Sequence, residues 1–84
     1  MRQANFNDVV NHIISEAVVN TTNGSWCVYF EEIEVEFETK LTKEARDKIL
    51  SLLKDRVEVA EVEINENCFD MVLWLHYCGI DEED

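Results

Sequence analysis

Residues 31–39 read EEIEVEFET, an alternation of apolar and acidic side chains. The apolar positions are Ile33, Val35 and Phe37, and the acidic positions between and beside them are Glu32, Glu34, Glu36 and Glu38. A period of two is typical of a β-strand with one buried face and one wet face. The sequence therefore predicts a strand that presents a row of like charges to solvent.

The residues just before this stretch alternate in the opposite phase. Trp26, Val28 and Phe30 stand at even positions, whereas the apolar side chains from Ile33 onward stand at odd ones. A uniform strand cannot change phase without turning its core face to solvent. A β-bulge near Glu31-Glu32 is the preferred explanation, because Glu-Glu is poor chemistry for a tight hairpin.

Two helices are predicted from apolar stripes. The first stripe is Phe6, Val9, Val10, Ile13, Ile14 and Ala17, with Asn5 or Asn7 as the N-cap and Asp8 in the first turn. The turn signal Asn23-Gly24 follows it. The second stripe is Ala45, Ile49, Leu52, Leu53 and Val57, with Thr42 as the N-cap.

The remaining elements are two strands joined by a short turn. Residues 57–64 predict a strand with a phase slip between Val59 and Ala60, and residues 65–67 predict a turn. Residues 69–77 are apolar on nearly both faces, which is typical of a central strand. Trp74 would then be at least partly buried.

These pieces predict an α+β fold: a small open antiparallel or mixed sheet of three to four strands with two helices packed on one face. The element order is α-β-α-β-β, or α-β-β-α-β-β if the chain breaks at Glu31-Glu32. Placing the most apolar strand in the middle gives the strand order 1-3-2. Residues 1–80 form one domain, and the acidic tail 81–84 is expected to be frayed.

Charge is strongly unbalanced and segregated. The net charge is −12, with 19 acidic and 7 basic residues among 84. Residues 40–56 carry a net charge of +3, residues 1–39 carry −6 and residues 57–84 carry −9. Such a chain should avoid nucleic acid and anionic membranes and be drawn to basic protein surfaces.

Cysteine usage and the N-terminus favour the cytoplasm, which we take to be that of a bacterial host. Three cysteines without a Cys-x-x-Cys pair make no disulfide framework, and the N-terminus lacks the apolar run of a signal peptide. His76, Cys78, Cys68 and Cys27 could supply zinc ligands only by a favourable register, so we expect buried thiols, no metal and no cofactor. No hydrolase or phosphate-binding motif is present, and we expect no enzyme activity.

The leading functional hypothesis is a small inhibitor that occupies the basic nucleic-acid groove of a DNA- or RNA-handling protein by imitating the phosphate backbone. Its primary contacts would be Glu32, Glu34, Glu36 and Glu38, supported by Glu31, Glu58, Glu61 and Glu63, and Asp70 could widen the patch. In size and charge the chain is similar to phage-encoded inhibitors such as anti-CRISPR proteins and uracil-DNA glycosylase inhibitors. The aromatic residues Trp26, Tyr29, Trp74 and Tyr77 could be interface anchors, but core packing is favoured.

Three alternatives stay open. The row of glutamates could be only a solvated sheet face, because neighbouring charges about 6.6 Å apart repel weakly in water. The chain could be a scaffold domain that forms a homodimer through a strand edge or an apolar patch. It could also be an immunity protein or antitoxin against a basic nuclease, which would use the same electrostatics as the inhibitor.

Overall fold

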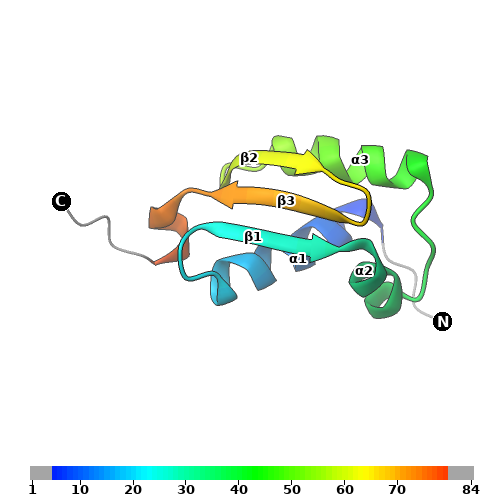
Figure 1. Ribbon diagram of the computed structural model, residues 1–84, viewed down its shortest axis with the longest axis horizontal. Coiled ribbons are helices and arrows are strands. Elements are labelled where there is room, and N and C mark those ends of the chain that lie inside the picture. Colours follow the sequence, from blue (N-terminus) through cyan, green and yellow to red (C-terminus); the bar gives the residue numbers. More distant parts are fainter. Residues whose placement is uncertain (1–4, 80–84) are drawn as a thin grey trace.

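The computed structural model describes residues 5–79, which form a three-stranded sheet with two long helices on one face (Figure 1). The elements are α1 (Phe6–Asn20), β1 (Ser25–Tyr29), α2 (Phe30–Phe37), α3 (Lys43–Lys54), β2 (Val59–Ile64), β3 (Cys68–Leu73) and the 3₁₀ helix η1 (Leu75–Cys78). The strand order is β1-β3-β2, and both neighbouring pairs are antiparallel. The predicted α+β class, strand order and one-sided placement of the two long helices are confirmed. The acidic tail 81–84 lies outside the described residues.

Helix α1 begins and packs as its sequence pattern predicts. The side chain of Asn5 accepts a hydrogen bond from the backbone N–H of Asp8, and the Asp8 carboxylate accepts one from the Asn5 N–H, which forms a capping box. The stripe from Val9 to Ala17 is buried against the sheet, but Phe6 is exposed. The N-cap is therefore Asn5, which was one of the two predicted candidates.

The predicted strand over residues 31–39 is wrong, because residues 30–37 form helix α2. Phe30, Ile33 and Phe37 are buried with the helical spacing i, i+3 and i+7, whereas Val35 is 74% exposed. The change of phase near Glu31-Glu32 therefore reflects the start of a helix, and the expected bulge or hairpin is absent there.

The end of β1 explains why a helix forms at this point. Tyr29, the last residue of β1, pairs with Cys68, the first residue of β3, so a longer β1 would have no partner strand. The Phe30 N–H donates to the Asn67 carbonyl at 2.8 Å, and helix α2 then pairs its own backbone groups. Glutamate is also a better helix former than strand former.

Helix α3 and the β2–β3 hairpin match their predicted patterns closely. Thr42 caps α3 by accepting from the Ala45 N–H at 3.1 Å, and Ile49 and Leu53 are buried. The register of β2 shifts between Val59 and Glu61, which confirms the predicted phase slip. Val57, expected at the end of the buried stripe, is exposed.

The last strand is shorter than predicted. Strand β3 ends at Leu73, which pairs with Val59, and residues 75–78 form η1 instead of continuing the strand. The Trp74 N–H still donates to the Glu58 carbonyl at 3.0 Å, but β2 begins at Val59 and β1 at Ser25, so neither neighbouring strand continues beside residues 75–78. Trp74 is consequently 50% exposed, so it is partly buried but lies outside the core.

The two faces of the sheet differ completely in character. The face covered by α1 and α3 buries Val28, Phe69, Met71 and Leu73 with the two helical stripes. The register places Cys27, Asp70 and Glu63 in one row across the opposite face, which none of the helices within residues 5–79 covers (Figure 1). No helix within residues 5–79 combines the length and apolar character needed to cross a bilayer.

Candidate functional site

The glutamates that were predicted to form one row point in different directions around α2. At 3.6 residues per turn, Glu32 and Glu36 share one flank of the helix, whereas Glu34 lies on the opposite flank. Glu38 follows the helix in the left-handed conformation, at φ 52°. The evenly spaced ladder needed to imitate a phosphate backbone is therefore not formed by this segment.

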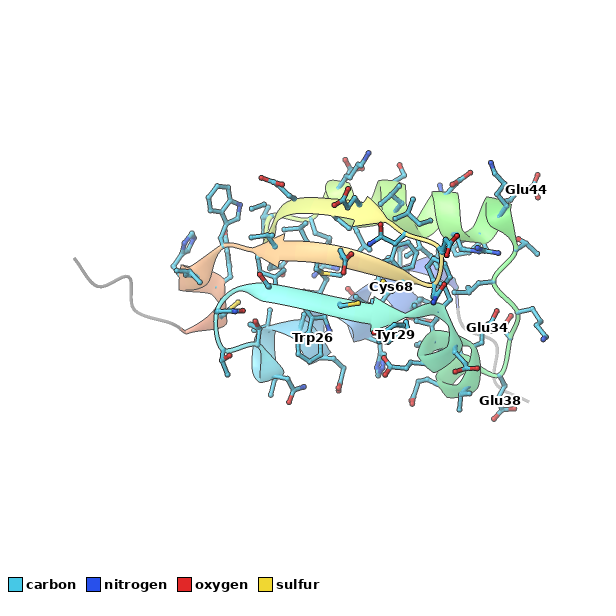
Figure 2. The ribbon with its side chains drawn as sticks, viewed as in Figure 1. Trp26, Tyr29, Glu34, Glu38, Glu44 and Cys68 are labelled. Atoms are coloured by element: carbon cyan, nitrogen blue, oxygen red, sulfur yellow. The ribbon has the colours of Figure 1, made fainter. Side chains whose placement is uncertain are left out.

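Glu34 has a structural partner. Its Oε2 atom accepts a hydrogen bond from the backbone N–H of Leu41 at 2.8 Å, and its side chain is half-buried. Leu41 is itself buried, so this contact fastens the linker between α2 and α3 to the core. Glu31, Glu34 and Glu38 line a shallow hollow with Lys40, and Figure 2 shows Glu34 and Glu38 near this linker.

Glu32 and Glu36 line a groove between α1, β1 and α2, and a third glutamate lines the same groove. We call this the α1/α2 groove and define it by His12 and Glu16 from α1, Trp26 from β1, and Glu32 and Glu36 from α2. Its volume is about 270 Å³. No lysine or arginine lines it among the described residues.

Two of the rings that line the groove, those of His12 and Trp26, contact other parts of the molecule. The His12 ring meets Phe37 edge-on, with ring centroids 5.4 Å apart, and Phe37 is buried. Trp26 is half-buried and packs against the core from β1. The groove is thus lined both by carboxylates and by rings that pack against buried residues.

Of the four supporting glutamates of the predicted patch, the three near or on β2 are Glu58, Glu61 and Glu63, and they are not all brought together. Glu58 precedes β2 and forms an ion pair with Arg56, at 3.1 Å from Arg56 Nε. The hydrogen bonds from Arg56 lower the pKa of the Glu58 carboxyl below its ordinary value, against a smaller opposing effect of burial. Glu61 and Glu63 instead lie on the open face of the sheet, together with Asp70. Lys54 lines a hollow together with these three carboxylates, so their surroundings are less uniformly acidic than the groove.

The basic side chains are concentrated on and around α3. Arg46 stacks over the Phe30 ring, 4.9 Å from its centroid, and its Nε donates to the Leu41 carbonyl at 3.1 Å. Within residues 5–79, the Arg56–Glu58 contact is the ion pair that forms. The lysines and arginines of α3 therefore leave the carboxylates of the α1/α2 groove unneutralised.

The cysteines and His76 do not assemble as the sequence suggested they could. The structure brings Cys27 and Cys68 together with Asp70, whereas neither His76 nor Cys78 belongs to this cluster. Tyr29 and Tyr77 are exposed, so core packing does not account for them, and Trp26 alone of the four aromatics packs against the core. Sequence reasoning missed Glu16 as a site residue, because its neighbours in the groove come from elements far away in the chain.

The chain matches no protein-family model, no curated protein and no solved structure. Fold and surface together define a small acidic α+β domain. It has a groove lined by carboxylates and aromatic rings on one side and basic residues on another. The groove and the separate basic region are therefore the features of this chain that bear on its function.

Proposed function

We propose that this chain is a protein-binding inhibitor that docks its acidic α1/α2 groove onto the basic nucleic-acid-binding surface of another protein and competes with nucleic acid there. The proposal keeps the acidic-inhibitor hypothesis but moves its contact surface. The groove glutamates Glu16, Glu32 and Glu36 replace the row over residues 31–38. The observation that supports it is that these three glutamates line one groove, and that no lysine or arginine lines this groove among the described residues.

The groove has the chemistry to accept a lysine or arginine side chain from a partner. Glu32 and Glu36 are one helical turn apart, a rise of about 6 Å, and Glu16 lines the same groove from α1. Carboxylates on either side of one cation would supply charge-assisted hydrogen bonds. The Trp26 ring offers an aromatic surface for the apolar stem of the same side chain or for its cation.

Long-range electrostatics support the same kind of partner. With a net charge of −12, the chain is attracted to positive surfaces before contact, which raises the association rate and makes it depend on salt. The basic residues of α3 would repel such a partner, so the protein should approach with the α2 side foremost. This charge asymmetry favours one docking orientation over others.

The test is a capture experiment from bacterial lysate with the purified chain immobilised. Wild type should retain a nucleic-acid-binding protein that is released by added duplex DNA or RNA. The Glu32→Gln/Glu36→Gln variant should bind it at least about tenfold more weakly, equivalent to ~1.4 kcal/mol. The matched control Glu61→Gln/Glu63→Gln changes the net charge equally on the open sheet face and should retain the partner.

Three outcomes would overturn the proposal. The two variants could weaken binding equally, which would make bulk charge the cause. The captured protein could be insensitive to nucleic acid. Light scattering could show a homodimer whose interface covers the groove, which would favour the self-association alternative.

A further inference from the structure

A second cluster, on the open face of the sheet, has the composition of a metal site. It comprises Cys27 on β1 and Cys68 and Asp70 on β3. The antiparallel register pairs Cys27 with Asp70 and Tyr29 with Cys68, so the three side chains leave the sheet on the same side. The two Sγ atoms and a carboxylate oxygen all lie within 4.8 Å of one another.

The spacing is close to that of a coordinated ion. In tetrahedral zinc coordination with Zn–S bonds of about 2.3 Å, two sulfur atoms are about 3.8 Å apart. The Cys68 Sγ is 3.9 Å from Asp70 Oδ1, and the largest separation in the cluster is bounded by 4.8 Å. Side-chain rotations that move the atoms by about 1 Å would therefore complete three ligand positions.

Neighbouring groups orient the ligands. The Asn65 amide donates a hydrogen bond to Asp70 Oδ2, which leaves Oδ1 directed at the Cys68 thiol. The same amide nitrogen lies 4.0 Å from Cys68 Sγ. Partners of this kind fix ligand orientation in metal sites, and mutation of such partners weakens metal binding. Figure 2 views the open face and shows Cys68 on β3 beside β1.

Without a cation the cluster is electrostatically unfavourable for thiolates. Partial burial, the Cys68 thiol and the Asp70 carboxylate raise the pKa of the Cys27 thiol to about 12, although residue 27 as a whole is exposed. The thiol is therefore protonated at neutral pH. A divalent cation would reverse this preference, because it stabilises the very anions that otherwise repel one another.

We propose that Cys27, Cys68 and Asp70 bind one thiophilic divalent cation of the Zn²⁺ class, with the remaining coordination position open to solvent. Two sulfur ligands select soft or borderline ions over Mg²⁺ and Ca²⁺. Binding converts two thiols to thiolates, and the two protons pass to solvent. The site lies apart from the α1/α2 groove, so it is independent of the proposed inhibitor function.

The experiment is a titration of the reduced full-length chain with Co²⁺ or Cd²⁺, followed by the thiolate-to-metal charge-transfer absorption and by displacement with Zn²⁺. One equivalent should bind. Cys27→Ser should weaken binding by about 100-fold or more and Asp70→Asn by about tenfold, whereas Cys78→Ser should have no effect.

Some outcomes would overturn the proposal. These are the absence of a charge-transfer band, a loss of metal affinity in Cys78→Ser equal to that in Cys27→Ser, or metal binding by Cys27→Ser with the affinity of wild type. Cys68 is buried, so Cys68→Ser could fail to fold. Cys27 is exposed, and its variant, checked for native circular dichroism, keeps the test decisive.

Discussion

Residues 31–37 and residues 58–64 read EEIEVEF and EVAEVEI, two similar mixtures of glutamate and apolar residues. The first segment is within helix α2 and the second contains strand β2. Local composition therefore does not decide between helix and strand here. The difference lies in what each segment meets in the folded chain.

Strand β2 has a partner supplied by the next element. The turn after Ile64 brings β3 alongside, with the Asn65 N–H donating to the Cys68 carbonyl at 2.8 Å. The segment after β1 has no such partner, because β3 begins level with Tyr29. An unpaired extended backbone there would lose its hydrogen bonds, whereas a helix supplies them internally.

The largest effect on the free energy of unfolding is expected at the core positions of α2. Ile33→Ala removes a side chain that is 1% exposed and should lower the free energy of unfolding by about 2–4 kcal/mol. Val35→Ala, at a position that is 74% exposed, should change it by less than about 0.5 kcal/mol. Urea denaturation followed by circular dichroism measures both. Similar losses at the two positions would mean that they share one buried face, as in a strand.

A smaller effect is expected at the glutamates of the same helix. Glu34→Ala leaves the Leu41 N–H without its acceptor and should cost about 1–2 kcal/mol of unfolding free energy. Glu34→Gln keeps an acceptor oxygen and should recover part of the loss. Glu36→Ala serves as the surface control, with a change below about 0.5 kcal/mol. Equal stability of all three variants would refute the structural role of Glu34.

The smallest effect on the free energy of unfolding is expected at Glu58, just before β2. Glu58→Gln removes the charge that pairs with Arg56 and should cost about 0.5–1 kcal/mol at pH 7. Arg56 lowers the pKa of Glu58 in the folded state, so the contribution is present above the ordinary glutamate pKa. It is lost as the pH falls through the lowered folded-state value.

Chemical denaturation at a series of pH values tests this dependence. The stability curves of wild type and Glu58→Gln should converge in acid. Glu61→Gln, on the exposed face of β2, should show no comparable difference at neutral pH. A constant difference in the free energy of unfolding between wild type and Glu58→Gln at every pH would exclude the ion pair as the cause of that difference.

Much of the fold could be predicted because several signals are local. The Asn5 cap, the stripe of α1, the Thr42 cap and the slip at Ala60 depend on residues within one or two turns of one another. The strand order follows from chain connectivity and from the apolar character of β3. The candidate site could not be predicted in the same way, because Glu16 and Glu36 line one groove only after the chain folds α1, β1 and α2 around it.

The sequence by itself determined the α+β class, the acidic excess and the concentration of positive charge around α3. These are sums over residues or short-range periodicities, which do not depend on distant contacts. Only the tertiary structure decided that residues 30–37 coil into a helix, which glutamates share a groove, and that two cysteines meet an aspartate across β1 and β3. Each of these depends on which strand ends beside which, and backbone pairing over long distances along the chain decides that.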